Sequence, residues 1–282
     1  MLMKWTGQQI STNAYQVLAG YYDQLMDEVD YDAWCDYVLS LVTEVRVLDV
    51  GNESADSGIL QEHRAKVPHK VLDLACGTGE FTYRFRQRGF EVTATDICSA
   101  MLTVAEAKAR SLGLAVQFVR QDMRALELPG QYDMVFCLCD SLNYLLESAD
   151  WAATFQGVAN LVRPGGHFIF DVNTAYKLAT VYGDHTYAAD QGDFAYIWEN
   201  EYQADTGLCY MDLAFFRKRS LPQTVDLYEK LTETHVQRAL SLETITQLIQ
   251  GAGLELLGQY GDLTCLPPTD TTERITFLCG KS

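Results

Sequence analysis

The sequence lacks most features of a membrane, secreted or metal-binding protein. No apolar run approaches the roughly 18 residues that a membrane-spanning helix needs, and residues 1–5 (MLMKW) lack a secretory pattern. Eight cysteines are present, but no two have the C-x-x-C spacing, which argues against a metal site and a disulfide framework. We therefore expect a cytoplasmic protein with reduced, mostly buried cysteines and no bound metal.

Basic residues are also scarce. The chain has 21 Lys and Arg against 38 Asp and Glu, a formal net charge of -17. This charge disfavours nucleic acid and anionic membranes as partners. The densest basic clusters, at 84–88 and 217–219, are typical of a solvated helix face and a hairpin edge. A length of 282 residues suits one large domain, or one domain with an insertion, and leaves both a monomer and a homodimer open.

The sequence does contain apolar runs that alternate with helical patterns. Strands are predicted at about 71–75, 91–95, 115–119, 133–138 and 166–171, and helices near 79–89, 98–111 and 149–162. A helix at 241–251 and strands near 254–260 and 273–279 follow. This alternation is typical of βαβ units. We therefore expect an α/β fold with a Rossmann-like, mostly parallel sheet of seven strands.

Two parts of the chain lie outside this alternation. Before the sheet, amphipathic helices are predicted at about 14–27 and 31–45. Residues 47–51 (VLDVG) imitate the start of a glycine motif without its second glycine, so 46–66 are interpreted as a polar connection.

After the fifth predicted strand, strand-like runs at about 190–238 predict an antiparallel insertion over the carboxyl ends of the parallel strands. An insertion there would enclose a ligand, because ligands of open α/β sheets bind at those ends. The predicted division is a cofactor-binding core of 1–175 and 239–282, with N-terminal helices, and a substrate lid of 176–238.

The most informative stretch is 71–82 (VLDLACGTGEFT), which combines a buried strand, a glycine turn and a helix start. Gly77 and Gly79 permit a tight turn and close approach of a ligand, and the next helix offers free N–H groups. Asp73 lies inside the strand, and Thr82 stands where a dinucleotide fingerprint has its third glycine. The stretch predicts a nucleotide-type cofactor site that differs from a dinucleotide site.

Five blocks in a fixed order carry a family resemblance. Residues 72–79 (LDLACGTG) resemble the first motif of class I S-adenosylmethionine-dependent methyltransferases. Four further blocks resemble the later motifs of that family, namely 93–102 (TATDICSAML), 121–123 (QDM), 132–139 (YDMVFCLC) and 162–171 (VRPGGHFIFD). The resemblance implies S-adenosyl-L-methionine as cofactor and S-adenosyl-L-homocysteine as product. The order also resembles a bacterial branch related to amino-sugar N-methyltransferases, which implies a small-molecule acceptor.

The chemistry of this cofactor agrees with the residue types. Asp96 can accept from both ribose hydroxyls, and Asp122 can accept from the adenine amino group while the Met123 N–H donates to the ring. The resemblance implies that Asp73 and the 77–79 backbone hold the methionine end. Strand-end acids can instead cap helices. The predicted cofactor residues are Tyr15, Tyr22, Asp73, Cys76, Gly77, Gly79, Asp96, Ile97, Met101, Asp122, Met123 and Leu138.

Methyl transfer requires alignment of the acceptor and, where the acceptor loses a proton, a base. His235, in the predicted insertion, is a candidate base near neutral pH, although a single histidine on a strand can also be structural. Asp140 and Asp171, which follow the fourth strand and end the fifth, are the other candidate catalytic residues. The candidate substrate contacts are Asn143, Asn173 and Arg238.

The sequence therefore predicts a methyltransferase that uses S-adenosylmethionine and methylates the nitrogen or oxygen of a small molecule. Two alternatives stay open, namely methylation of RNA or protein, and a catalytically silent cofactor-binding or assembly protein. A dehydrogenase is disfavoured by Thr82, by Asp73 and by the acid at 122.

Overall fold

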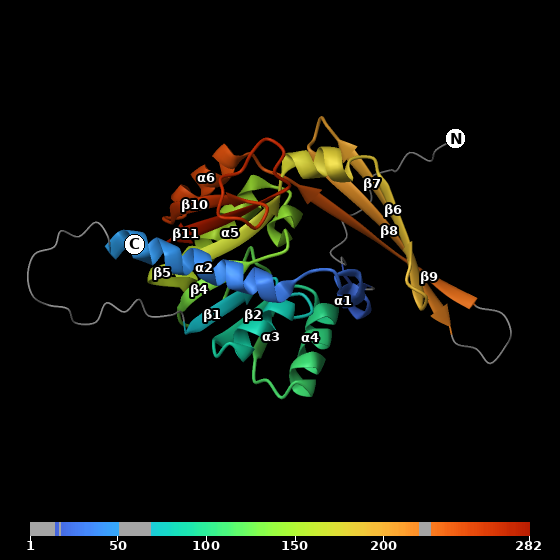
Figure 1. The fold of residues 1–282 in the computed structure, drawn as a ribbon, viewed down its shortest axis with the longest axis horizontal. Helices are drawn as coiled ribbons and strands as arrows, with labels where there is room; N and C mark the ends of the chain where they lie inside the picture. Colours follow the sequence, from blue (N-terminus) through green and yellow to red (C-terminus); the bar gives the residue numbers. More distant parts are fainter. Residues whose placement is uncertain (1–14, 17, 51–68, 220–226) are drawn as a thin grey trace, which may run out of the picture.

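The computed structural model describes residues 15–16, 18–50, 69–219 and 227–282. Within them lie two β-sheets (Figure 1), a seven-stranded sheet in the order β10-β11-β5-β4-β1-β2-β3 and a four-stranded sheet in the order β6-β7-β8-β9. β11 runs antiparallel to both of its neighbours, and β3, β2, β1, β4 and β5 pair in parallel. The predicted Rossmann-like α/β sheet of seven strands is confirmed.

The central sheet matches the predicted pattern closely. Its strands are β1 (Lys70–Leu74), β2 (Glu91–Asp96), β3 (Gln117–Arg120), β4 (Tyr132–Cys137), β5 (Val162–Asn173), β10 (Glu255–Gly261) and β11 (Arg274–Gly280). Its helices are α2 (Tyr31–Val50), α3 (Glu80–Gln87), α4 (Ser99–Ser111), α5 (Ser148–Leu161) and α6 (Leu242–Gly251). Except for α2, the predicted helices and strands of this sheet differ from these bounds by only a few residues.

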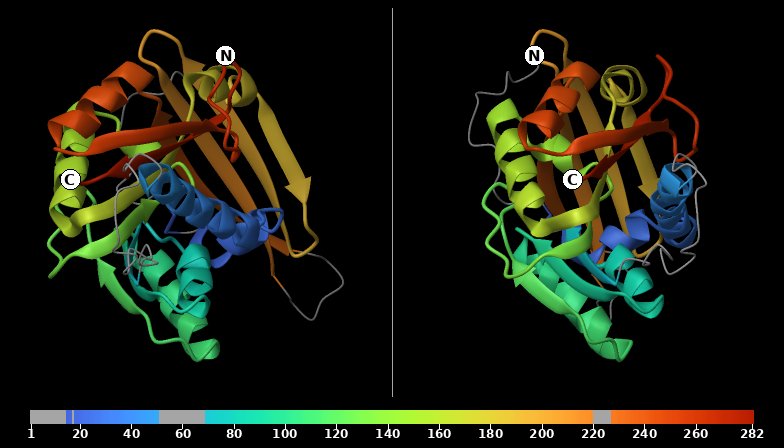
Figure 2. Two further views of the ribbon diagram at one scale, coloured as in Figure 1. Left: turned by 60° about the vertical axis from the view of Figure 1, so that its left-hand side comes forward. Right: turned by 90° about the vertical axis from the view of Figure 1, so that its left-hand side faces the viewer.

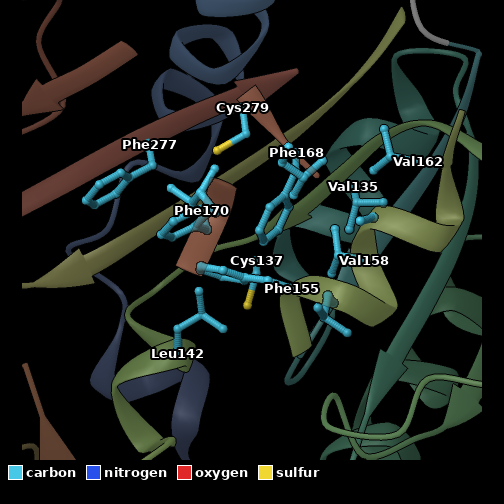
Figure 3. Close-up of a cluster of buried hydrophobic side chains, with 14 of the residues drawn as sticks. Val135, Cys137, Leu142, Phe155, Val158, Val162, Phe168, Phe170, Phe277 and Cys279 are labelled. Carbon is cyan, nitrogen blue, oxygen red and sulfur yellow. The ribbon is translucent and has the colours of Figure 1, made fainter. Parts of the chain in front are cut away.

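Both faces of the central sheet are covered, because successive side chains of a strand point to opposite faces. On one face, α5 and α6 pack over an apolar cluster that includes Phe155 and Phe168 (Figure 3). Phe170 and Phe277, on neighbouring strands, stack there with ring centroids 4.7 Å apart. On the other face, α2 and α3 pack over a second cluster that includes Phe136. Burial of each such phenyl group contributes about 1.5–3 kcal/mol.

The N-terminal predictions need two corrections. Residues 14–27 do not form one helix, because the described part contains a 3₁₀ turn, η1 (Leu18–Gly20), followed by a short α1 (Tyr22–Leu25). Gly20 ends η1, and glycine disfavours a continuous helix by about 1 kcal/mol. The helix predicted at 31–45 continues to Val50, so the predicted connection is wrong at 46–50. Its remainder, 51–66, lies outside the described residues.

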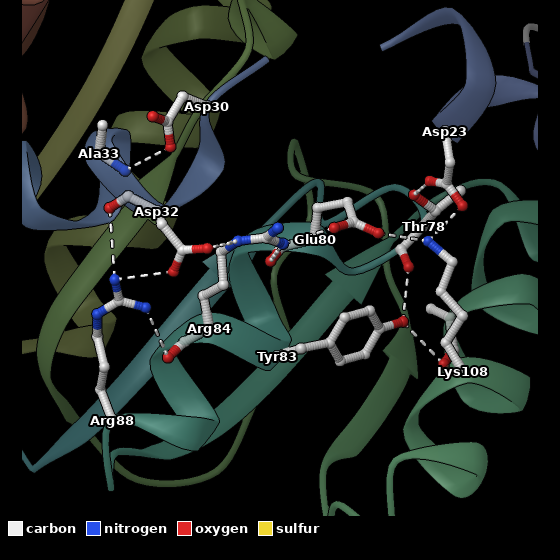
Figure 4. A network of polar contacts seen from close by, with 11 residues as sticks. Asp23, Asp30, Asp32, Ala33, Thr78, Glu80, Tyr83, Arg84, Arg88 and Lys108 are labelled. Carbon is white, nitrogen blue, oxygen red and sulfur yellow. Dashed lines mark hydrogen bonds and ion pairs between the residues drawn. The ribbon is translucent and has the colours of Figure 1, made fainter. Parts of the chain in front are cut away.

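The basic face of α3 is also not the solvated surface that the sequence predicts. Arg84 Nε lies 3.0 Å from Asp32 on α2 (Figure 4), and Arg88 Nη2 lies 3.0 Å from both Asp32 and Asp36. The two arginine side chains are only 24% and 25% exposed. These ion pairs therefore hold α2 against α3.

The second sheet corresponds to the predicted antiparallel insertion. It comprises β6 (Thr186–Asp190), β7 (Phe194–Gln203), β8 (Leu208–Arg219) and β9 (Leu227–Arg238), and a π-helical turn, η3 (Lys177–Tyr182), precedes it. Figures 1 and 2 show this sheet beside the central sheet, with α1 between the two. Its inner face packs on the N-terminal segment through a cluster of Leu18, Phe194, Leu213 and Phe215. The predicted division into a core and a 176–238 lid stays a prediction.

No helix among the described residues is long and apolar enough to cross a membrane.

Candidate functional site

The carboxyl ends of β1, β2, β4 and β5 meet at one edge of the central sheet, where open α/β sheets bind ligands. Among the described residues, six non-glycine residues have positive φ. Four of them lie at this edge or in the segment that packs over it, namely Tyr15, Ala75, Cys139 and Asp140. Such conformations cost about 1–3 kcal/mol each and gather at functional sites. The backbone geometry therefore points to this edge.

The glycine turn connects β1 to α3 and contacts the end of β2. Gly77 (φ 57°) and Gly79 (φ 86°) adopt left-handed conformations, and a Cβ on Gly79 would lie 2.4 Å from the Tyr83 hydroxyl. Asp96, the last residue of β2, accepts hydrogen bonds from the backbone N–H of Gly77 at 2.8 Å and of Cys98 at 2.7 Å. Burial raises the pKa of the Asp96 carboxyl. Each carboxylate oxygen retains a lone pair for a ligand hydroxyl.

Asp73 contacts the start of α3 in the structure. Its Oδ2 atom accepts a hydrogen bond of 2.5 Å from the Thr82 hydroxyl, and the residue is only 2% exposed. Burial raises the pKa of the Asp73 carboxyl to about 7. Thr82, which stands where a dinucleotide fingerprint has its third glycine, thus attaches α3 to β1 through its hydroxyl. The contact of Asp73 with the methionine end of the cofactor stays a prediction.

The predicted adenine side is more open. Asp122 pairs with Arg124 at 2.6 Å, and hydrogen bonding to Arg124 lowers the pKa of the Asp122 carboxyl. Met123 packs against the cluster beneath α5, while Ile97, just after β2, is 50% exposed. These three residues flank the ends of β2 and β3, where their cofactor contacts stay predictions.

Tyr15 and Tyr22 lie beside the predicted cofactor site. Their rings meet edge to face with centroids 5.7 Å apart, and both pack against Met101 near the start of α4. Cys76 packs under α4 with Leu102, whereas Leu138 belongs to the cluster beneath α2. The structure therefore brings the two tyrosines and Met101 together, and places Cys76 and Leu138 in the adjoining apolar core.

Ionic contacts attach α1 to the glycine turn. The Thr78 hydroxyl donates to Asp23 at 2.6 Å, and Lys108 of α4 forms ion pairs with both Asp23 and Glu80 (Figure 4). Lys108 therefore links the N-terminal segment, α3 and α4. We call the contacts of Asp23 with Thr78 and Lys108 the Asp23 latch.

Alternate residues of β9 face the same edge of the central sheet. Gln237 Nε2 donates to Asp140 Oδ2 at 2.7 Å, and His235 Nδ1 lies 3.2 Å from the Tyr144 hydroxyl in η2 (Ser141–Tyr144), which follows β4. Glu233 accepts hydrogen bonds of 3.2 Å from backbone N–H groups of the N-terminal segment. The second sheet thus contributes polar groups to the site, and the catalytic role of His235 stays a prediction.

Asp140 and Asp171, the two candidate catalytic acids, pair with the same arginine. Arg274 of β11 pairs with Asp140 at 2.7 Å and also with Asp171, whose side chain is 0% exposed. Despite burial, Arg274 keeps the pKa of the Asp140 carboxyl below its usual value. Burial raises the pKa of the Asp171 carboxyl, so the two acids share one guanidinium but differ in the direction of their pKa shifts, and their predicted catalytic role stays a prediction.

The side chains of the three candidate substrate-binding residues form hydrogen bonds with other groups of the protein. Asn143 donates to the backbone carbonyls of Asn173 and Arg238, each at 3.0 Å, and accepts from the Asn173 N–H at 2.9 Å. The Asn173 side chain donates to Gln237 at 3.0 Å, and Arg238 donates to the Leu146 carbonyl at 2.9 Å. Asn143 and Asn173 are 0% exposed. These residues join β5, η2 and β9, and their predicted contacts with substrate stay predictions.

Four residues of the site were not singled out from the sequence, namely Tyr144, Glu233, Gln237 and Arg274. The period-two alternation in 233–237 carried a signal for two of them, because side chains two apart on a strand share a face. Arg274 had no local signal. Arg274 lies at the site because β11 pairs with β5.

Comparisons with known proteins agree with this geometry. A family model described as a methyltransferase domain matches residues 71–166. YqeM of Bacillus subtilis, which is named provisionally as a methyltransferase, is 33% identical over 271 residues, covering 95% of this chain and 97% of its own. The chain belongs to the S-adenosylmethionine-dependent methyltransferases.

Solved structures support the assignment at the level of the whole chain. An S-adenosylmethionine-dependent methyltransferase from Clostridium acetobutylicum is 31% identical, with a TM-score of 0.78 over 96% of this chain and 100% of its own. The sugar N-methyltransferase KedS8 from Streptoalloteichus has a TM-score of 0.71 over 100% of both chains at 17% identity. KedS8 therefore shares the fold.

The residues at the sheet edge fit S-adenosylmethionine. The space beside Gly77 is open, because a Cβ at that position would have no other atom within 4 Å, and Asp96 is a hydroxyl acceptor held by two backbone N–H groups. The cofactor has no phosphate, which agrees with an acid, rather than a third glycine, beside the turn. This methyltransferase would hold the ribose at Asp96.

Proposed function

We propose that this methyltransferase transfers a methyl group to nitrogen or oxygen of a small-molecule acceptor held between the carboxyl edge of the central sheet and β9. The observation that carries the proposal is the contact between His235 and Tyr144, with Nδ1 and the hydroxyl oxygen 3.2 Å apart. This contact joins a titratable group of the second sheet to the loop after β4, where the cofactor fold presents its reaction centre.

Burial favours a small acceptor. The side chains of His235 and Glu233 are each 7% exposed, and Tyr15 packs on His235 with ring centroids 4.7 Å apart. A folded protein or an RNA duplex would reach these groups only after the N-terminal segment moved away. The net charge of -17 also opposes RNA, and the fold shared with the sugar N-methyltransferase KedS8 agrees with a small acceptor.

A proton path is part of the proposal. When bound, S-adenosylmethionine supplies a methyl group whose carbon–sulfur bond breaks as the acceptor–carbon bond forms, with the electron pair staying on sulfur. An acceptor that carries a proton gives it up, and His235 receives it at Nδ1 through the Tyr144 hydroxyl. Burial raises the pKa of Tyr144, so Tyr144 passes a proton and does not persist as phenolate. The proposal assigns the base role to His235 and not to Asp140 or Asp171, because both of these carboxylates pair with Arg274.

We also propose a cytoplasmic location. All eight cysteines are free thiols, in agreement with a reducing compartment. Six of them are buried and act as small apolar side chains.

The test is transfer of labelled methyl groups from S-adenosylmethionine to a cell extract that has been separated by mass, before and after ribonuclease and protease treatment. We expect label in the low-mass fraction, and much less of it with Asp96→Ala. Label that ribonuclease or protease removes would contradict the small-molecule acceptor. Cofactor binding without any transfer would indicate a silent binding protein.

A further inference from the structure

A buried glutamate beside the proposed base has no assigned role in the reaction. Glu233 precedes His235 by two residues on β9, so both side chains point to the same face, and each is 7% exposed. Glu233 Oε2 accepts a hydrogen bond from the Tyr15 N–H and Oε1 accepts one from the Leu18 N–H, each at 3.2 Å. A buried carboxylate is costly without such partners, so it is ordered by the N-terminal segment.

His235 lies between this carboxylate and Tyr144. Its Nε2 atom is 3.4 Å from Glu233 Oε2, which is an ion-pair distance. The two atoms do not form a hydrogen bond in the structure, because Nε2 is a buried atom without a hydrogen-bond partner. The opposite ring nitrogen, Nδ1, lies 3.2 Å from the Tyr144 hydroxyl. A hydroxyl, an imidazole and a carboxylate therefore follow one another in space.

We propose that Glu233 is a positioning residue that acts through His235. Its carboxylate favours the tautomer with hydrogen on Nε2, which leaves Nδ1 to accept a proton from Tyr144. When His235 takes up that proton, Glu233 supplies the opposite charge at 3.4 Å. The same division of roles, with a base oriented by a third group, recurs in activated nucleophiles on unrelated folds. The inference rests on the proposed methyl transfer with proton loss.

The contacts with Tyr15 and Leu18 give the arrangement a second consequence. The same carboxylate accepts hydrogen bonds from the N–H of Tyr15, which precedes η1, and from the N–H of Leu18, the first residue of η1. Displacement of the N-terminal segment would remove two hydrogen bonds from Glu233 and release it from its present position. Glu233 is therefore in position beside His235 when this segment packs over the cofactor site.

The test compares Glu233→Gln, His235→Gln and the double variant with the wild type. Transfer is measured with labelled S-adenosylmethionine and the low-mass extract fraction, and cofactor affinity is measured by calorimetry. Because the glutamine carbonyl still accepts one backbone N–H, Glu233→Gln should keep the cofactor Kd within about threefold. The loss of the charge should lower kcat by roughly 10- to 100-fold. Glu199→Gln, on the exposed outer face of the same sheet, is the matched control and should change neither value.

The double variant separates positioning from a merely structural role. If Glu233 acts through His235, the His235→Gln enzyme should lose no further kcat when Glu233→Gln is added. The inference would be overturned if the two substitutions lowered kcat independently, so that their effects multiplied in the double variant. It would also be overturned if Glu233→Gln left kcat unchanged. Should Glu233→Gln fail to fold, Glu233→Asp, which keeps the charge, must be less active through kcat alone. Absence of transfer by the wild type would overturn the proposed function, and this inference with it.

Discussion

At the scale of single residues, the acids at the strand ends differ in burial and partners. Asp73 is held by a threonine hydroxyl, Asp96 by two backbone N–H groups, and Asp122 by an arginine. The sequence predicted their positions, because each follows or lies within an apolar run. It did not predict Arg274 beside Asp140 and Asp171, because that guanidinium comes from a strand more than 100 residues further along the chain.

Replacement of Asp96 should weaken cofactor binding and leave the fold intact. Because the carboxylate is the expected acceptor for the ribose hydroxyls, Asp96→Ala should raise the Kd for S-adenosylmethionine roughly 10- to 100-fold. Calorimetric titration measures the effect. Asp205→Ala, at an exposed position in the turn between β7 and β8, is the control. An unchanged Kd in Asp96→Ala would remove the ribose assignment.

The raised pKa of Asp73 predicts a specific dependence of stability on pH. The carboxyl has a pKa of about 7 in the folded protein, against 3.8 for an unperturbed aspartate, so the folded state binds more protons between these values. The free energy of unfolding therefore falls as pH rises from about 4 to 7 and then stays level. In Asp73→Asn this loss is absent. In the absence of cofactor, the free energy of unfolding of the variant minus that of the wild type should rise by roughly 2 kcal/mol between pH 5 and pH 7.5.

Thermal unfolding at these two pH values measures the difference, and Asp133→Asn provides the contrast. Backbone N–H groups and Arg163 lower the pKa of the Asp133 carboxyl, so this carboxyl is ionised in both states throughout the range. Asp133→Asn should lose equal stability at both pH values. A pH-independent effect of Asp73→Asn would show that its buried carboxyl does not titrate near 7.

At the scale of helices and strands, regular patterns were predictable and short or irregular segments were not. The strands of the central sheet are apolar runs bounded by turn residues, and packing on both faces enforces them. The segment before α2 has aromatic residues at helical spacing, but Gly20 interrupts it, and its tyrosines pack on β7–β9 and α4. The arginines of α3 were assigned to solvent because their partners lie on α2, 52 to 56 residues away in sequence.

The Asp23 latch should contribute to cofactor retention at this scale. Asp23→Ala removes a hydrogen bond to Thr78 and a partly exposed ion pair with Lys108, together worth about 1 kcal/mol. The Kd for S-adenosylmethionine should rise about fivefold, and proteolysis before α2 should become faster. Asp27→Ala, at an exposed position after α1, should change neither. Equal behaviour of the two variants would mean that α1 does not retain the cofactor.

At the scale of the whole molecule, the site requires both sheets. The central sheet supplies the glycine turn and the acids, and the inner face of β9 supplies Glu233, His235 and Gln237. The sequence predicted that an antiparallel insertion lies near the carboxyl edge, since the alternation of strands and helices stops after 171. It did not identify which β9 residues meet which loops, because that depends on the register of β8 and β9 and on packing of the two sheets.

A crystal structure with bound S-adenosylhomocysteine tests the account of the site most directly. We predict the ribose hydroxyls at Asp96, the adenine beside Asp122 and Met123, and the sulfur facing Tyr144 and His235. A ribose bound at another acid, or a sulfur turned away from the His235–Tyr144 pair, would contradict the site proposed here.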